Sequence, residues 1–306
     1  MRIHPPAVSA YTVLTDVPEA DGTLAWDSTT VVICEVTAGD ATGTGWTYGP
    51  AAVADLLNEQ LAPVVTGLDP MNIPAAHDAM CRAIRNTGRP GVASCGISAL
   101  DIALWDLKAR LLELPLVQLL GAARTEVRVY GSGGFTTYHD KHLAAELNGW
   151  VHGQGIPRVK IKVGESWGHS VPRDLSRVRT ACEVIGPQAE LYVDANGAYT
   201  RKQAVRVGHA FAEQGMGWFE DPVSSDDLTG LRVVRDALVC DVAAGEYGYD
   251  LPYFARMVAA GAVDCLQVDA TLPHCLKGVG GTPSGGLTEF LRATLRTGEV
   301  EQYRVA

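Results

Sequence analysis

Six short apolar segments recur over residues 127–268 with a helical pattern between them, and this rhythm limits the possible folds more than any other feature. The segments are VRVYG (127–131), RVKIKV (158–163), ELYVD (190–194), GWFE (217–220), DVAAG (241–245) and DCLQV (264–268). Strands that alternate with helices form right-handed βαβ units and a parallel sheet. Because no GxGxxG follows a strand, the repeat favours a (β/α)₈-type TIM barrel over a dinucleotide-binding sheet.

The residues before this repeat follow a different pattern. TTVVICEV (29–36) alternates like a half-buried strand, and helical patterns cover 51–64, 74–86 and 94–112. The last of these carries one apolar stripe at helical spacing. We therefore expect an α+β capping domain over 1–125 and the α/β barrel domain over 126–306.

Composition and charge exclude several classes of function. Apolar residues make up 47% of the chain, which is typical of a globular protein. The formal net charge is −10 and the sequence has no Lys/Arg cluster, so we expect no nucleic-acid or anionic-membrane partner. No apolar run reaches the ~18 residues that cross a bilayer, and no signal-peptide core begins the chain. The seven cysteines form no CxxC pair, which indicates reduced thiols and a cytoplasmic protein.

Polar side chains end successive predicted strands. They are Lys160 and Lys162, Asp194 and Asn196, Glu220 and Asp221, Glu246, and Asp269. They recur at roughly 25–30 residues, about one βα unit, so they should converge on the mouth of the barrel where active sites form. One carboxylate at a strand end is often only a helix N-cap, but several in phase are harder to explain in that way.

These residue types predict a metal site with a base beside it. Asp194, Glu220 and Glu246 form a hard oxygen site suited to Mg²⁺, and without a cation they would raise one another's pKa values. No His or Cys stands among these strand ends, so a soft metal is disfavoured. A cation and desolvation would both lower the pKa of Lys160 or Lys162, leaving one of them able to act as a base near pH 7. This suits abstraction of a proton α to a carboxylate, with Mg²⁺ stabilising the enediolate.

Several sequence motifs resemble those of a known family. VKIKVG (159–164), YVDANG (192–197), WFEDP (218–222), AAGEYG (243–248) and LQVDAT (266–271) resemble the strand-end motifs of the enolase superfamily, and within it those of the mandelate racemase group. SALDIALWDLKAR (98–110) and VYGSGG (129–134) are similar to the end of that group's cap domain and to its first barrel strand. Enolase-superfamily sites are an established case of a Lys or His base that works with Mg²⁺.

The resemblance implies a role for each matching residue. Asp194, Glu220 and Glu246 match the metal ligands. Lys162 matches the general base, and Lys160 matches its electrostatic partner. The substrate would be a small-molecule carboxylate, either a hydroxy acid or an acid sugar, and the group commonly forms homo-oligomers.

Three further features are implied by the same resemblance. Asn196 matches an amide close to the substrate or the metal. Asp269 matches a residue that orients a second acid/base histidine on the seventh strand. The segment 15–27 resembles the mobile cap loop that closes over the substrate.

The resemblance ends near residue 271. A Gly-rich stretch (271–286) and a short amphipathic helix (287–296) stand where the group has its seventh strand and catalytic histidine, and His274 matches no motif. We therefore expect an incomplete barrel of about six strands, with its first and sixth strands unpaired and an apolar flank exposed.

Two functions of different classes remain open. The first is Mg²⁺-dependent proton abstraction that leads to dehydration of an acid sugar (a lyase), or else to racemisation or epimerisation (an isomerase). The second is a catalytically silent relative that binds only metal or partner chains. An unrelated barrel enzyme is a distant third.

Overall fold

Three antiparallel strands open the chain and form one sheet in the order β1-β2-β3. Their bounds are β1 (Ala7–Ala20), β2 (Ala25–Ala38) and β3 (Ala41–Tyr48). The computed structural model describes residues 1–270 and 304–305. Along β2 the side chains of Val32, Cys34 and Val36 are buried while Glu35 is exposed, which is the alternation expected of a sheet with one covered face.

The helix α4 (Val92–Leu111) covers the buried face of this sheet, and the other helical segments of the first half of the chain pack with it in one core. These other segments are α1 (Ala52–Leu56), the π-helical turn η1 (Leu57–Leu61), α2 (Ala62–Val65), α3 (Ile73–Ala83) and α5 (Leu116–Leu119). The predicted helices at 51–64, 74–86 and 94–112 agree with this set to within three residues at each end. The apolar stripe of α4 is buried in the core of this α+β layer, as its spacing predicts.

The approach of α4 to β3 depends on glycine. A Cβ atom built at Gly45 would lie 2.0 Å from the carbonyl oxygen of Ala99 and 2.6 Å from the amide nitrogen of Ala103. These are backbone atoms that cannot rotate away. Gly45 therefore fixes how closely the longest helix packs on the sheet.

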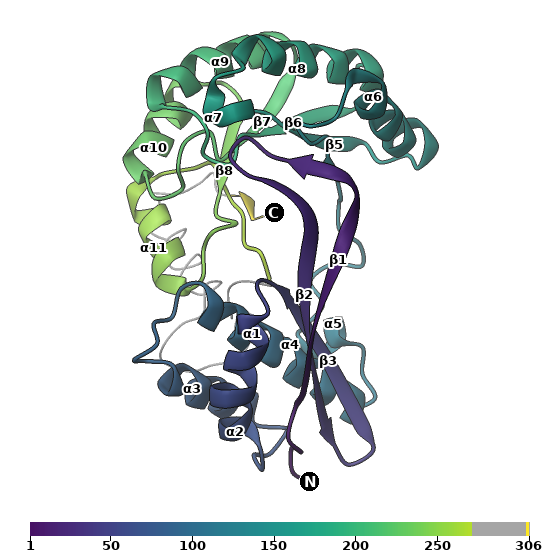
Figure 1. Ribbon diagram of the computed structural model, residues 1–306, viewed down its shortest axis with the longest axis vertical. Helices are drawn as coiled ribbons and strands as arrows, with labels where there is room; N and C mark the ends of the chain where they lie inside the picture. The colour runs from purple at the N-terminus through teal and green to yellow at the C-terminus, as the bar shows by residue number, and fades with distance from the viewer. Residues whose placement is uncertain (271–303, 306) are drawn as a thin grey trace.

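The second half of the chain forms a parallel sheet in the order β10-β9-β8-β7-β6-β5-β4. Its strands are β4 (Gly131–Gly133), β5 (Arg158–Lys162), β6 (Glu190–Asp194), β7 (Met216–Glu220), β8 (Asp241–Ala244), β9 (Cys265–Leu266) and β10 (Arg304–Val305). Helical segments follow the strands and form an outer layer around the curved sheet (Figure 1). They are α6 (Asp140–Asn148), η2 (Gly149–Gly153), α7 (Glu165–Gly168), α8 (Val171–Ile185), α9 (Arg201–Glu213), α10 (Leu228–Ala237) and α11 (Leu251–Ala260). This is the expected α/β barrel architecture.

Two details of the barrel differ from the sequence-based expectation. The first strand covers 131–133 rather than 127–131, because Tyr130 and the residues before it have no ladder partner among the described strands. The prediction that the sixth strand, β9, is left unpaired is also wrong. Cys265 and Leu266 pair in parallel with Arg304 and Val305 of β10.

Other expectations concern residues that the structure does not describe. The Gly-rich stretch, His274 and the helix at 287–296 lie outside the described residues. The domain boundary at 125/126 stays a prediction. In the described part of the chain, no helix is long and apolar enough to cross a membrane.

The tip of the β1–β2 hairpin reaches the barrel (Figure 1). The hydroxyl of Thr136 donates to the carbonyl oxygens of Ala20 and Asp21, at 3.1 and 2.9 Å. The amide of Trp167 donates to the carbonyl oxygen of Gly22 at 2.8 Å. The segment that resembles a cap loop is thus the end of a long hairpin held against loops of the barrel.

We predict that Gly45→Ala destabilises the protein by about 2 kcal/mol, since the methyl group forces β3 and α4 apart. The measurement is the free energy of unfolding in urea. Gly217→Ala is the matched control, because a Cβ there meets nothing within 4 Å and the position is exposed in β7. Equal stability of both variants would show that the packing at Gly45 is not tight.

Candidate active site

Strand register brings the candidate residues together. Lys162 of β5 stands beside Asp194 of β6, and Asp194 stands beside Glu220 of β7. All three occupy the last position of their strands, so their side chains leave the sheet at the same mouth. The predicted convergence of these strand-end residues is therefore a consequence of three neighbouring strands that end at the same level.

Both lysines of β5 reach the same carboxylate. Lys162 donates from Nζ to Oδ2 of Asp194 at 2.5 Å, and Nζ of Lys160 lies 3.4 Å from the same oxygen. Lys160 also donates to Oε1 of Glu220 at 2.5 Å. Residues 160 and 162 are two apart on one strand, so their side chains leave the same face and both extend into the barrel mouth.

Glu220 is completely buried and lies against Asp194. Oε2 of Glu220 accepts a long hydrogen bond of 3.4 Å from the indole of Trp218. Burial, followed by the charge of Asp194, raises the pKa of Glu220 to about 8, although the charge of Lys160 acts to lower it. Burial acts to raise the pKa of Asp194. The charges of Lys162 and Lys160 act in the opposite direction and hold this pKa well below its usual range.

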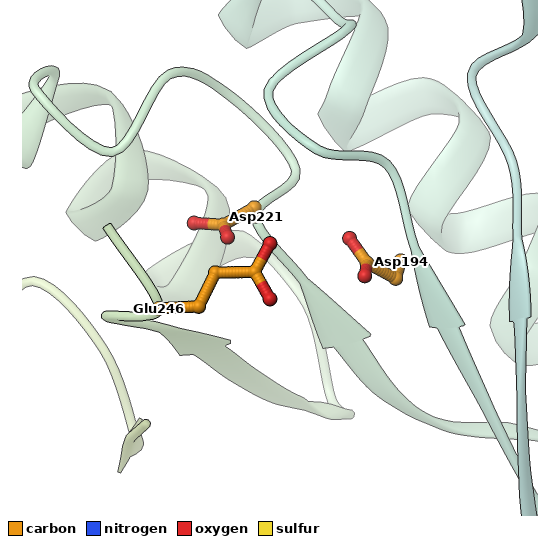
Figure 2. A group of neighbouring side chains, drawn as sticks. All are labelled: Asp194, Asp221 and Glu246. Carbon is orange, nitrogen blue, oxygen red and sulfur yellow. The ribbon is translucent and has the colours of Figure 1, made fainter. Parts of the chain in front are cut away.

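A fourth carboxylate, that of Asp221, joins the site. The sequence predicts it at a strand end but indicates no role for it. Single oxygens of Asp194, Asp221 and Glu246 lie within 4.8 Å of one another, and Figure 2 shows their carboxyl groups facing a common space. Asp221 follows Glu220 directly at the end of β7. Two acidic residues in succession at a strand end (WFEDP) are the sequence signal that marks it.

The backbone at this site is unusual. Asn196 and Asp221 have left-handed conformations, with φ angles of 46° and 38°. Non-glycine residues adopt such angles at a cost, and they are enriched at functional sites. The turn allows the amide of Asn196 to donate to Oδ1 of Asp194 at 2.9 Å, while its side-chain Nδ2 donates to Oε1 of Glu246 at 2.9 Å. Asn196 therefore links two of the carboxylates.

The charges and the unpaired oxygens fit a divalent cation. Asp194, Glu220, Asp221 and Glu246 together carry up to four negative charges, against two positive charges from the lysines. Both carboxyl oxygens of Asp221 are buried and accept no hydrogen bond among the described residues. Burial, followed by the charges of Asp194 and Glu246, raises the pKa of Asp221 well above its ordinary value. Hard oxygen donors in excess of the local positive charge are the donor set that Mg²⁺ binds.

The lysines do not behave as the sequence alone suggested. Burial acts to lower the pKa of Lys162, but the charges of Asp194, Glu246 and Glu220 together outweigh it and the pKa is raised. The same competition raises the pKa of Lys160. The prediction of a lysine that is neutral near pH 7 is therefore not met by these side chains alone, because it presumed a cation beside them.

Asp269 lies on the side of the site that faces the cap. It follows β9. Burial is the main cause of the raised pKa values of Cys95 on α4 and of Tyr249, and the charge of Asp269 adds to both. The hydroxyl of Ser98 on α4 donates to the carbonyl oxygen of Ala270 at 2.8 Å. The end of β9 is thus in contact with the long cap helix, and the proposed role of Asp269 stays a prediction.

Comparison with known proteins agrees with this architecture. Residues 11–121 match the family model "Mandelate racemase / muconate lactonizing enzyme, N-terminal domain", and residues 142–294 match "Enolase C-terminal domain-like". The chain belongs to the mandelate racemase/muconate lactonizing enzyme family of the enolase superfamily. Its curated relatives include acid-sugar dehydratases, cycloisomerases and an epimerase.

Three similar proteins illustrate the range of similarity to known proteins. L-talarate/galactarate dehydratase of Salmonella typhimurium is 32% identical over 86% of this chain and 63% of its own length. A mandelate racemase/muconate lactonizing enzyme-like protein from Rubrobacter xylanophilus has a TM-score of 0.88 and 46% identity, covering 100% of this chain and 81% of its own. A racemase from Streptomyces coelicolor A3(2) with bound magnesium has a TM-score of 0.86 and 28% identity, covering 99% and 83%. The chain spans 63–67% of the length of the first four curated relatives.

We predict that Lys160→Met destabilises the metal-free protein by about 3 kcal/mol, because Glu220 and Asp194 lose a buried countercharge. The double variant Lys160→Met/Glu220→Gln should regain part of this loss. The measurement is urea unfolding in the presence of a chelator, with the exposed Lys141→Met as the control. A single variant as stable as the parent would contradict the pairing.

Proposed function

We propose that this chain binds one Mg²⁺ at the barrel mouth and removes the proton α to the carboxylate of a hydroxy acid or acid sugar. Asp194, Glu220 and Glu246 are the proposed ligands, Lys162 is the proposed base, and Lys160 is its electrostatic partner. The observation that supports this most is the shared Oδ2 of Asp194, which joins both lysines to the carboxylate cluster. A base and a cation site that touch the same atom suit proton abstraction beside a carboxylate.

Each group has a distinct task in the proposed reaction. Asn196 fixes the orientations of Asp194 and Glu246. Lys162 accepts the α-proton on Nζ, which requires that Nζ first lose the proton it now shares with Asp194. Bound Mg²⁺ would supply positive charge that lowers the pKa of Lys162 and stabilises the negative charge developing on the substrate carboxylate. Lys160 keeps its proton and adds a second positive charge at 3.4 Å from Asp194.

Dehydration of an acid sugar is the outcome that we propose first. After Lys162 takes the α-proton, the electron pair left on the α-carbon expels the β-hydroxyl, which leaves as water once it has gained a proton. Dehydratases recur among the curated relatives, and this supports the proposal. Racemisation is second, since it needs another acid/base group on the opposite face of the substrate.

We predict that Mg²⁺ raises the melting temperature of the parent chain and that Asp194→Asn abolishes the rise. A ligand at a hundred times its dissociation constant stabilises the folded state by about 2.7 kcal/mol. Differential scanning fluorimetry with a Mg²⁺ titration measures the shift. Asp236→Asn, on the exposed face of α10, is the control and should keep it. A rise that survives in Asp194→Asn would remove this residue from the metal site.

We predict that Lys162→Ala lowers the rate of α-proton exchange by about 10²–10⁴-fold, the range expected for loss of a general base. Proton NMR of acid sugars in D₂O with Mg²⁺ measures the exchange, and the surface variant Lys202→Ala is the control. Unchanged exchange in Lys162→Ala would exclude this lysine as the base. Mg²⁺ binding without exchange in the parent chain would favour the catalytically silent alternative.

A further inference from the structure

A second cluster of reactive side chains lies in the cap, away from the barrel mouth. His77 and Cys81 stand one turn apart on α3, and Asp101 faces them from α4. Nε2 of His77 lies 3.4 Å from Sγ of Cys81, and Nδ1 lies 3.3 Å from Oδ1 of Asp101. A thiol, an imidazole and a carboxylate in this order have the connectivity of a nucleophile, a base and an orienting group.

The geometry fixes which ring nitrogen faces the sulfur. An ionised carboxylate only accepts hydrogen bonds, so Nδ1 of His77 donates to Asp101 and Nε2 is left to face Cys81. From there a neutral Nε2 can take up the thiol proton, and the imidazolium so formed donates to the thiolate. The charged ring therefore favours the thiolate of Cys81 over the thiol.

The environment of His77 supports the charged form of the ring. Burial acts to lower the pKa of His77, but hydrogen bonds to Asp101 and Cys81 outweigh it and raise the pKa to about 9. The charges of Asp101 on α4 and of Cys81 on α3 are among those that raise the pKa of His77. On the same helix, Asp78 and Arg82 form an exposed ion pair with each other.

The arrangement does not converge on a metal ion. The imidazole lies between the sulfur and the carboxylate, so these two ligand atoms sit on opposite sides of the ring. Among the described residues, the group whose ligand atoms gather within 4.8 Å is Asp194, Asp221 and Glu246, and the cap cluster forms no such group. The cluster therefore suits nucleophilic chemistry at sulfur better than metal binding.

We propose that Cys81 is a modification site, a nucleophilic thiolate that His77 stabilises and Asp101 orients, and that it exchanges with small disulfides such as oxidised glutathione. The Cys81 sulfur bonds to one sulfur of the disulfide and the disulfide bond breaks. The other half leaves as a thiol after taking up the proton released by Cys81. Cys81 is oxidised and the leaving half is reduced, so the exchange needs no further oxidant. The proposal does not depend on the metal site.

The chain contains a matched control for this thiol. Cys182 on α8 is half-buried, as Cys81 is, but burial and the charge of Glu183 raise its pKa. A limiting amount of iodoacetamide at pH 6.5, followed by mass spectrometry of the peptides, compares the two rates in one sample of the intact chain. We expect Cys81 to react at least about ten times faster, the change in thiolate fraction given by one pKa unit. Oxidised glutathione should form a mixed disulfide at Cys81 ahead of Cys182.

His77→Gln should reduce the rate at Cys81 to that at Cys182, and circular dichroism shows whether the variant is folded. If the variant does not fold, the pH dependence of the alkylation rate in the parent chain tests the proposal. The rate at Cys81 should be near its plateau at a pH where the rate at Cys182 still increases. A rate at Cys81 no greater than that at Cys182 would overturn the proposal. So would a fast rate that persists in folded His77→Gln, or equal pH profiles for the two thiols.

Discussion

The site depends on three buried carboxylates that lie beside a fourth, partly exposed one and two lysines. The chain places Asp194, Glu220, Asp221 and Glu246 within one barrel mouth, where three of them have little or no contact with water. Such a group of charges is costly to bury unless positive charge is supplied. Lys160 and Lys162 supply part of it, and within the described part of the chain the carboxyl oxygens of Asp221 accept no hydrogen bond. This imbalance is the physical reason for placing a cation here.

Register and backbone conformation determine how these side chains meet. Lys162, Asp194 and Glu220 are neighbours across three strands that end at the same level. Left-handed turns at Asn196 and Asp221 then direct the next residues back over the strand ends. The tip of the β1–β2 hairpin connects the cap to the barrel. The carbonyl oxygen of Gly22 and the carbonyl oxygens that Thr136 contacts make this connection. Segments far apart in sequence thus share one site because the parallel sheet aligns their ends.

Much of the fold could be predicted from the sequence, because it depends on the spacing of apolar residues within each element and on the regular recurrence of polar residues at the strand ends. The alternation of strands and helices, the stripe of α4 and the strand-end carboxylates each follow from local spacing, and the structure contains them. The position of the first barrel strand could not be predicted, since VRVYG has the composition of a strand but the ladder with β5 begins only at Gly131. The pairing of β9 with β10 joins residues almost 40 positions apart, which no local pattern specifies.

In the site too, local sequence patterns identify residues, whereas their contacts depend on the fold. Residue types and phase identify Asp194, Glu220 and Glu246, but they do not show that Glu220 pairs with Lys160 while Asp221 turns towards the other two carboxylates. The pKa values of the lysines depend on the balance between burial and those carboxylates, which is a property of the folded arrangement. The cap cluster of His77, Cys81 and Asp101 also needs the packing of α3 on α4, although the i, i+4 spacing of its first two members is visible in the sequence.

The central claim is that the barrel mouth holds one divalent cation, and crystallography of the chain soaked with Mn²⁺ tests it most directly. We expect a single anomalous peak whose ligands are Asp194, Glu220 and Glu246, at about 2.2 Å. A peak bound elsewhere, or a well-ordered site without one at saturating Mn²⁺, would contradict it.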